Sequence, residues 1–385
     1  MYIGQKMAKY DYGIIHVQDD FYYHAVLYKY DNHPFRTATS GGAFVGSGLN
    51  TLSKYNWIDF SRISWDECSA SWAVCIRRRG FSLMRVRIDE GVYIDLINLR
   101  INQRISFEGE VERRSNIRQL ADFIEARSAG NAVIVFGDTG SLYARSGNNI
   151  RLLTARHGLT DAWVRAIGGM APATRIDPIV CLKGVPANIH CEVVDKVLYR
   201  GSSIIDLKSS GFFYDTSRFL SPEGNMLTDR HPVRVEFGYT LKSKLRQSDL
   251  YGGPHGTWFN DILSIPESPK LSSITLRGAN RLDGLTLTLV SGQAFVHGGS
   301  GGSPHSITLA SGEYITSVKL CWGQKDGHTR NFYAQATTNE GRSLQAGKRT
   351  DDCATATAPS GYGVVGAYGQ DGEGIDQLGF IYAQQ

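Results

Sequence analysis

Three short segments of the sequence place aspartates where a predicted strand begins or ends. They are FGDTGS around Asp138, VDKVLY around Asp195 and LTDRHPV around Asp229, and the last also contains His231. Metal-dependent cleavage of a phosphodiester uses carboxylates to hold a hard cation and a histidine to move the proton of the attacking water. These residue types indicate a phosphodiesterase-like site, although Arg230 stands beside the histidine.

Glycine-rich loops near the C-terminus suggest a different chemistry, the recognition of sugar hydroxyls. A carboxylate can accept hydrogen bonds from two adjacent hydroxyls, and glycine lets backbone N–H groups approach a sugar closely. The loops at Gly252–Gly253 and Gly372–Asp376 combine these features. Such glycines also form tight hairpin turns and aspartate commonly caps a turn, so a purely structural role is the alternative.

Strand and helix patterns alternate over the first 240 residues. We expect the strands and helices they predict to position the three aspartates. The run NAVIVFGD is continuously apolar and rich in β-branched residues, as expected of a buried strand. The preceding segment RRSNIRQLADFIEARSAG has helical periodicity, and we expect Ser115 to cap this helix and Gly130 to stop it. Many strands with few helices predict two packed sheets flanked by helices.

The composition changes after the polar segment LKSKLRQSDL, where glycine and serine become frequent. We place a domain boundary between residues 246 and 247. Beyond it, short strand patterns such as SSITLRG and DGLTLTLV are separated by glycine-rich turns. This spacing predicts an all-β second domain.

Residues 3–239 resemble the endonuclease/exonuclease/phosphatase superfamily, which includes deoxyribonuclease-like and sphingomyelinase-like phosphodiesterases. The resemblance rests on YDYGIIHVQDDF, MRVRIDEGVYIDLINLR, NAVIVFGDTGS and VDKVLYRG together. It implies that residues 1–246 form an α+β domain, the four-layer α/β sandwich of that superfamily. The family's first strand, with its own catalytic asparagine, would precede Met1.

The resemblance also matches each candidate catalytic residue to a position in the superfamily's catalytic site. The positions are Asp19 (usually glutamate), Arg100 and Arg230 (usually histidine), Gly140 (usually asparagine), and the retained carboxylates Asp138, Asp195 and Asp229. Arginine cannot act as a base because its guanidinium stays protonated. Two arginines beside the carboxylates would pair with them and repel a divalent ion, so we expect a vestigial, inactive catalytic site that holds no metal.

Three alternatives remain open for this first domain. His231 would be the base if the motif were displaced by one residue, but neighbouring residues of a strand point to opposite faces, so it should face away from Arg230. A surviving Mg²⁺ site on the four aspartates would make the protein a lectin-targeted nuclease, sphingomyelinase or phosphatase. A basic cleft could also bind an anionic, phosphate-bearing ligand, such as a lipid or nucleic acid, without cleaving it.

Residues 248–384 resemble the jacalin-related lectins, through YGGPHGTWFND, HGGSGGSPHSITLASGEYITSVKLCWG and YGQDGEGIDQLGF. That family folds as a β-prism, which implies an all-β domain over residues 247–385 that binds glycans or glycoproteins. The implied sugar-binding residues are Gly252, Gly253, Gly372, Glu373, Gly374 and Asp376. Because the first glycine loop lies within the chain, and Glu373 or Gly374 replaces the aromatic residue of galactose binders, mannose or glucose is favoured. We expect Trp258 to fill the prism core.

The six cysteines fall into three local pairs, and none is part of a CxxC motif, so disulfides are favoured over a zinc site. The expected pairs are Cys68 with Cys75, Cys181 with Cys191, and Cys321 with Cys353. Disulfides indicate an oxidising compartment, so we expect an extracellular, secreted protein. The N-terminal segment lacks the apolar region of a signal peptide, so that signal is not present in this chain. No window approaches the ~20 apolar residues that span a bilayer.

The formal net charge of +4 comes from the first domain, because residues 248–385 hold more acidic than basic residues. The run Arg77–Arg79 permits a phosphate-bearing partner but is more typical of a solvated surface. We therefore predict an extracellular lectin fused to a dead phosphodiesterase-like scaffold. It would need no cofactor, and Mg²⁺ would be required only if the enzymatic alternative held. The sequence leaves an oligomer open.

Overall fold

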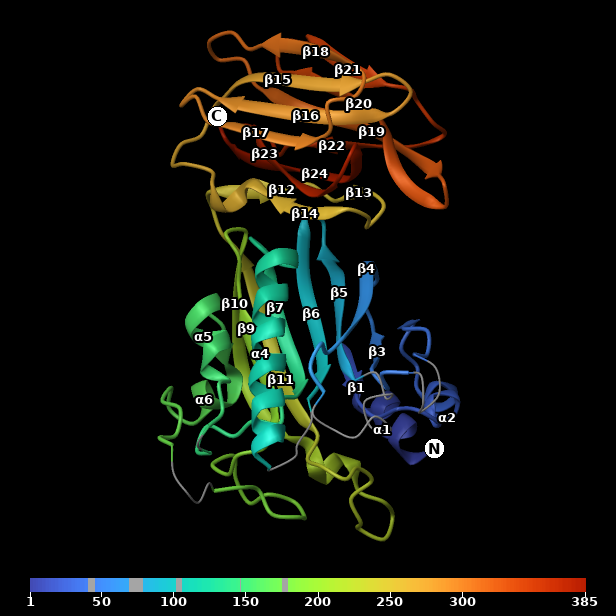
Figure 1. Cartoon of the computed structure of the whole chain (residues 1–385), viewed down its shortest axis with the longest axis vertical. Coiled ribbons are helices and arrows are strands. Elements are labelled where there is room, and N and C mark those ends of the chain that lie inside the picture. Colours follow the sequence, from blue (N-terminus) through green and yellow to red (C-terminus); the bar gives the residue numbers. More distant parts are fainter. Residues whose placement is uncertain (41–45, 69–78, 102–105, 146, 175–178) are drawn as a thin grey trace.

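The computed structural model covers the whole chain and shows two parts stacked end to end (Figure 1). The first part contains both helices and strands, and the second consists almost entirely of strands. The described residues are 1–40, 46–68, 79–101, 106–145, 147–174 and 179–385.

A six-stranded sheet forms the centre of the first part, in the order β4-β5-β6-β7-β9-β8. Its middle strand β6 is buried along all nine residues, because both of its faces are covered. Strands β6 and β7 run parallel, and the other neighbouring pairs are antiparallel. The strands are β4 (Trp57–Ser64), β5 (Gly80–Asp89), β6 (Val92–Arg100), β7 (Ala132–Asp138), β8 (Thr160–Asp161) and β9 (Asp195–Arg200).

Two smaller sheets pack against one face of this sheet. The ring of His16 on β1 stacks on Phe136 of β7 at 3.6 Å between centroids, and Phe237 of β11 meets Tyr199 of β9 at 5.0 Å. The strand orders are β1-β3-β2 and β10-β11. Their bounds are β1 (Ile14–Val17), β2 (Phe35–Arg36), β3 (Asn50–Ser53), β10 (Ile205–Tyr214) and β11 (Val233–Leu241).

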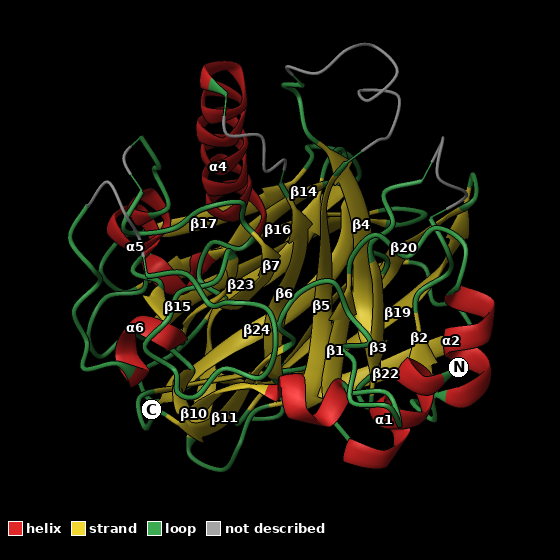
Figure 2. Ribbon diagram, turned by 90° about the horizontal axis from the view of Figure 1, so that it is seen from below, coloured by secondary structure: helices red, strands yellow, loops and turns green. Residues whose placement is uncertain are grey.

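Helices flank the sheets on both sides, with α1 and α2 opposite to α4 and α5 (Figure 2). These layers are compatible with the expected α/β sandwich. No helix among the described ranges is both long and apolar enough to cross a membrane. The helices are α1 (Tyr2–Tyr10), α2 (His24–Tyr30), α4 (Phe107–Arg127), α5 (Arg151–His157), α6 (Ala162–Ala166) and the 3-10 helix η1 (Asp215–Phe219).

Helix α4 begins earlier than the sequence suggested. The hydroxyl of Ser106 accepts a hydrogen bond from the backbone N–H of Gly109 and so caps the helix. The prediction that Ser115 is the cap is wrong, because Ser115 lies in the middle of the helix. The helix ends at Arg127, shortly before Gly130, whose φ of 78° suits a glycine beyond a helix end.

The second part is a β-prism made of three sheets. Their orders are β12-β24-β23-β14 with β13 paired to β24, β17-β16-β15-β18, and β21-β20-β19-β22. The predicted domain boundary between residues 246 and 247 falls within β12. The exact position of the boundary stays a prediction. The bounds are β12 (Leu245–Gln247), β13 (Tyr251–Gly252), β14 (Thr257–Asn260), η2 (Asp261–Leu263), β15 (Leu271–Gly278), β16 (Leu282–Leu289), β17 (Ala294–Gly298), β18 (Ser303–Thr308), β19 (Ile315–Lys325), β20 (His328–Thr338), β21 (Ser343–Gly347), β22 (Asp352–Thr357), β23 (Tyr362–Asp371) and β24 (Ile375–Gln384).

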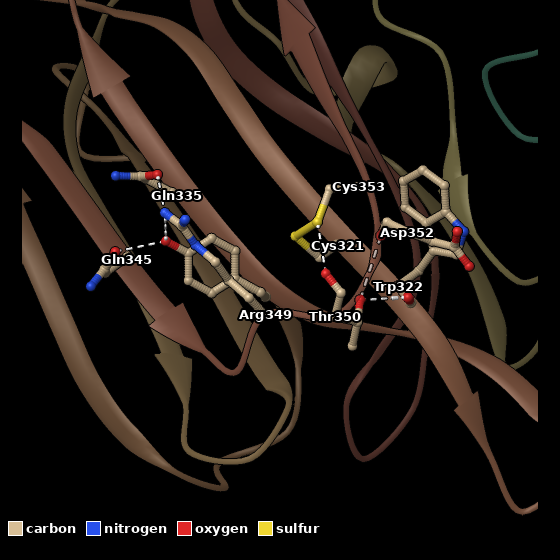
Figure 3. Close-up of a disulfide and its surroundings, with 9 residues drawn as sticks. Cys321, Trp322, Gln335, Gln345, Arg349, Thr350, Asp352 and Cys353 are labelled. Carbon is tan, nitrogen blue, oxygen red and sulfur yellow. Dashed lines mark hydrogen bonds between the residues drawn. A yellow bond between two sulfur atoms is a disulfide. The ribbon is translucent and has the colours of Figure 1, made fainter.

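Two predicted disulfides are confirmed. Cys181 bonds to Cys191 in the first domain, and Cys321 of β19 bonds to Cys353 directly opposite on β22 (Figure 3). Cys68 is disulfide-bonded, and its predicted partner Cys75 lies outside the described residues.

Asp249 joins the two domains through charged hydrogen bonds. Its carboxylate accepts from Arg87 Nε at 3.0 Å, from Arg87 Nη2 at 2.9 Å and from the hydroxyl of Tyr93 at 3.1 Å. Both donors lie near the junction of β5 and β6, at the end of the central sheet nearest the prism (Figure 1). The opposite ends of β6 and β7 therefore point away from the prism.

Trp258 fills the junction between the domains. Its side chain is buried, with the guanidinium of Arg85 from the first domain 3.6 Å from its ring. Its indole Nε1 donates to the carbonyl of Ala129 at 3.2 Å, and its ring meets Tyr368 of the prism edge-on. The expectation that Trp258 fills the prism core is therefore corrected, because much of its cover comes from the first domain.

Candidate functional sites

The sheet register gathers the predicted catalytic positions at the ends of three adjacent strands. Arg100 is the last residue of β6 and pairs in register with Asp138, the last residue of β7. Asp138 in turn pairs with Asp195, the first residue of β9. Side chains at paired positions of neighbouring strands lie side by side, so these three groups meet at the sheet end remote from the prism.

Two arginines bind the carboxylates of this cluster. Arg100 Nη1 contacts Asp138 Oδ2, and Arg100 Nη2 lies 2.8 Å from Asp19 Oδ2. Arg230 Nη1 lies 2.9 Å from the same Asp138 oxygen and 3.9 Å from Asp195 Oδ2. Asp138 is 2% exposed, so two cations share one buried carboxylate oxygen that solvent hardly reaches.

The other predicted catalytic residues take different positions. His231 is buried, and its Nδ1 lies 3.0 Å from the hydroxyl of Thr216. Asp229 is exposed. Gly140 has a φ of 61°, and its N–H donates to Asp138 Oδ1 at 2.9 Å, so the second oxygen of Asp138 is also occupied.

Burial and charge set the ionisation of this cluster. Burial raises the pKa of the Asp195 carboxyl, and the charges of Arg230 and Arg100 oppose that rise. Burial lowers the pKa of the Arg100 guanidinium, and the charge of Asp19 opposes this. Arg100 remains cationic at ordinary pH because a guanidinium loses its proton only in strongly alkaline solution.

The donor set does not fit the divalent cation that the superfamily resemblance implies. A hard cation such as Mg²⁺ needs several free oxygen ligands in near-octahedral order. Here Asp138 offers no free oxygen, because guanidinium groups and a backbone N–H bind both. Within the described ranges, no group of three or more His, Cys, Asp or Glu side chains is placed to hold a metal ion.

A second site lies in the prism, where two glycines bring the first glycine loop against β24. Gly252 has a φ of 104°, and a β-carbon there would lie 2.1 Å from the carbonyl oxygen of Asp376. The N–H of Gly253 donates to that same carbonyl at 3.0 Å. A β-carbon on Gly253 would lie 2.4 Å from the carbonyl of Thr329. Only glycine fits at either position.

Asp376 lies beneath this loop with one oxygen available. Its side chain is 4% exposed, and Oδ1 lies 3.3 Å from Arg330 Nη1. Within the part of the chain that the structure describes, no group donates a well-oriented hydrogen bond to Oδ1. Burial raises the pKa of the Asp376 carboxyl, and the charges of Arg330 and His255 oppose that rise. A buried acceptor whose only close donor group is poorly oriented can gain a well-oriented hydrogen bond from a ligand hydroxyl.

The turn between β23 and β24 completes the predicted sugar loop. The N–H of Gly372 donates to the carbonyl of Gly374 at 3.0 Å, which closes the turn. Gly372 and Glu373 are exposed, whereas Gly374 is buried. The carbonyl of Glu373 accepts from Arg281 Nη2 at 3.2 Å, so the turn is fixed while the Glu373 side chain faces solvent.

Three side chains at this site were not predicted from the sequence. His255 lies in the first glycine loop, and His328 and Arg330 come from the start of β20. The Asp326–Gly327 pair is the sequence signal that could have predicted the hairpin that carries His328 and Arg330. It is a typical hairpin turn in which both residues have positive φ, 55° and 77°. That hairpin carries His328 to within 4.4 Å of His255, between ring centroids.

The first domain also reaches the sugar loop, through the last residue of α4. Arg127 Nη1 donates to the carbonyl of Gly256 at 3.1 Å, and Nη2 donates to Gln370 Oε1 at 3.3 Å. The side-chain amide of Gln370 donates to Asp59 Oδ2 at 3.2 Å. The loop that would bind a sugar is thus held from both domains.

Comparison with protein families identifies the second domain. The family model described as a jacalin-like lectin domain matches residues 248–381. Among solved structures, a mannose binding jacalin related lectin from Ananas comosus has 25% sequence identity, a TM-score of 0.33, and coverage of 37% of this chain and 100% of its own. The Malaysian banana lectin has 22% identity, a TM-score of 0.32, and coverage of 36% and 98%.

The first domain is similar to proteins of a different kind. A sphingomyelinase from Mycobacterium tuberculosis is 31% identical over 244 residues, which are 62% of this chain and 47% of that protein. The chain therefore spans about half the length of this relative. Secreted RxLR effector protein 19 from Plasmopara viticola is 28% identical over 145 residues, 36% of this chain and 80% of that protein.

Proposed function

Because the C-terminal part of the chain is a jacalin-like lectin domain, we propose that this protein binds carbohydrate, on glycans or glycoproteins, through the loop around Asp376. The observation that carries the proposal is the buried Asp376 carboxylate, whose Oδ1 has no well-oriented donor among the described groups. Two hydroxyls of a sugar could donate to such a carboxylate, while the backbone N–H of the exposed Glu373 donates in return.

Within this proposal, the sugar is of the mannose or glucose type. The first glycine loop lies inside the chain and pairs with β24, so it offers no free N-terminal amine to a ligand. The turn at Glu373 and Gly374 carries no aromatic side chain on which the apolar face of galactose could stack. Both features favour a site that relies on hydrogen bonds to adjacent hydroxyls.

A glycan array probed with the full chain and with Asp376→Ala tests this proposal. We expect binding to glycans with terminal mannose or glucose, and a loss of about tenfold or more in the variant, because a charged hydrogen-bond acceptor contributes about 1.5–3 kcal/mol. Asp351→Ala is the matched control, since Asp351 is an exposed aspartate of the same domain. Absence of binding, or equal binding by Asp376→Ala, would refute the proposal.

We further propose that the first domain is a scaffold that does not hydrolyse phosphodiesters. The supporting observation is that Arg100 and Arg230 both bind Asp138, where a catalytic site would need free carboxylate oxygens and a base. Loss of a general base alone typically costs about 10²- to 10⁴-fold in rate. Here the nearby His231 is engaged with Thr216.

A lectin-targeted phosphodiesterase is the second candidate, favoured by the 31% identity to a sphingomyelinase. A thermal-shift titration with MgCl₂ separates the two. A functional metal site would raise the melting temperature in millimolar Mg²⁺, because a ligand that binds only the folded state stabilises it. We expect MgCl₂ to change the melting temperature no more than NaCl of matched ionic strength does. A saturable rise of the melting temperature with MgCl₂ would favour the phosphodiesterase.

We propose an extracellular location. The two disulfides with both partners described favour an oxidising compartment, and a similar protein is named as a secreted effector. Quantifying free thiols in the protein purified from its native source tests this location. If Cys181, Cys191, Cys321 and Cys353 all reacted as free thiols in that protein, the result would contradict an extracellular location.

A further inference from the structure

The candidate sugar site has an unusual concentration of cationic and protonatable side chains. His255 comes from the first glycine loop, while His328 and Arg330 come from β20 across the site. Lys325 is exposed at the end of β19, in the same hairpin. Neutral sugars require donors and acceptors but no excess of positive charge. A guanidinium and two imidazoles gathered at one spot are instead typical of a site that binds an anion.

The contacts place these groups around one spot. The imidazole rings of His255 and His328 lie 4.4 Å apart and nearly perpendicular. Arg330 Nη1 lies 3.3 Å from Asp376 Oδ1, and Arg330 Nε is buried without a hydrogen-bond partner among the described residues. Gly253, between them, brings the backbone of the glycine loop against β20. A sugar hydrogen-bonded to Asp376 would thus lie within reach of both imidazoles.

Two carboxylates and one guanidinium act on His255 while both histidines are neutral. Its pKa is lowered chiefly by burial and then by His328, whereas the charge of Asp376 raises it. The remaining charged groups that act on it are Arg330, which lowers the pKa, and Asp59 of the first domain, which raises it. The second carboxylate therefore compensates one added positive charge at His255, and any further positive charge needs a carboxylate or other anion that a ligand provides.

We propose that the sugar bound at Asp376 carries an acid group, a carboxylate or a sulfate ester, which lies against His255, His328 and Arg330. This inference rests on the proposed carbohydrate binding and narrows its ligand class. The Asp376 carboxylate accepts hydrogen bonds from two ring hydroxyls, and the acid group adds negative charge beside the histidines and Arg330. A bidentate guanidinium suits either a carboxylate or a sulfate.

The proposal predicts a specific pH dependence. A bound anion stabilises the protonated imidazole, so it raises the depressed pKa of His255 and binding takes up protons. Affinity for the acidic sugar therefore rises as the pH falls from 7.5 to 5.5, by about tenfold for a coupling of ordinary size. A neutral sugar lacks this coupling, so its affinity should change little over the same range.

Calorimetric titration of the full chain tests the proposal. The probes are glucose and mannose, their uronates, and their 6-sulfates, each at pH 5.5 and 7.5. We expect at least one acidic series to bind about tenfold tighter than its neutral parent at pH 5.5. The uronate and sulfate arms show which acid group is accepted. In His255→Gln the ratio of acidic to neutral affinity should fall towards one, whereas His305→Gln, at an exposed histidine of β18, should keep it.

Each contrary outcome has a distinct meaning. Equal affinity for neutral and acidic sugars, or an acidic preference that His255→Gln leaves intact, would overturn this inference while carbohydrate binding stands. Absence of binding to every sugar would overturn both. Binding of acidic sugars that survives in Asp376→Ala would show that the sugar is not held at Asp376, and would also refute the inference.

Discussion

Replacement of Trp258 by alanine should uncouple the two domains. The indole ring is 6% exposed, lies against the Arg85 guanidinium and donates to the carbonyl of Ala129, so its removal leaves a cavity at the junction. Truncation of a buried tryptophan costs about 3–5 kcal/mol. For a domain of this size each kcal/mol corresponds to roughly 2–4 °C in Tm. The loss should therefore exceed about 6 °C.

Differential scanning calorimetry distinguishes this role from a role in the prism core. We expect one coupled transition in the unmodified chain and two separated transitions in Trp258→Ala. Trp258→Phe keeps a ring against Arg85 but loses the bond to Ala129, so it should remain coupled with a loss of about 1 kcal/mol. Trp322→Ala, which removes a ring stacked on Tyr251 inside the prism, should weaken the lectin without separating the transitions. A single transition in Trp258→Ala with a Tm within about 1 °C of the unmodified chain would refute the reasoning.

Three further changes test other parts of the structure. Arg127→Ala should weaken sugar binding about fivefold, because one bond of about 1 kcal/mol from the first domain to the sugar loop is lost; unchanged affinity in calorimetry would contradict this. Glu313 has its pKa lowered to about 2 by Arg342, so its stabilisation is present above pH 4.5 and lost as the pH falls through 2; Glu313→Gln should lower Tm at pH 7 but not at pH 2. Replacing Cys321 and Cys353 by alanine should cost about 3–4 kcal/mol in urea unfolding, as expected for a loop of this length.

Local sequence patterns predict the strands whose ends carry the cluster in the first domain, and the superfamily resemblance singles out the residues. NAVIVFGD and VYIDLINL correspond to β7 and β6, and the residues that end them, Asp138 and Arg100, pair in register. An apolar run that ends in a charged residue marks the point where a strand leaves the core. The two arginines contact the carboxylates as charge complementarity requires. The Cys181–Cys191 pair could be predicted because a separation of 10 residues keeps its ends close, whereas Cys321 and Cys353 are brought together by the pairing of β19 with β22.

Long-range placement could not be read from the sequence. Trp258 belongs to a strand pattern, and no periodicity shows that Arg85 of another domain covers it. The Asp326–Gly327 turn predicts a hairpin, but only closure of the prism brings His328 to His255. Ser115 was misplaced because serine is a common cap, whereas Ser106 has the geometry that caps the helix. Local signals define elements, and packing decides which elements meet.

The central claim is that function resides in the lectin while arginines block the former catalytic centre. The most direct test is hydrolysis of a phosphodiester panel, including sphingomyelin and plasmid DNA, in Mg²⁺ or Mn²⁺. The full chain is compared with a variant carrying Arg100→His, Gly140→Asn and Arg230→His. We expect no hydrolysis by the unmodified chain and a detectable rate in the variant. Metal-dependent hydrolysis by the unmodified chain, abolished by Asp138→Asn, would contradict the claim and make the lectin the targeting domain of an enzyme.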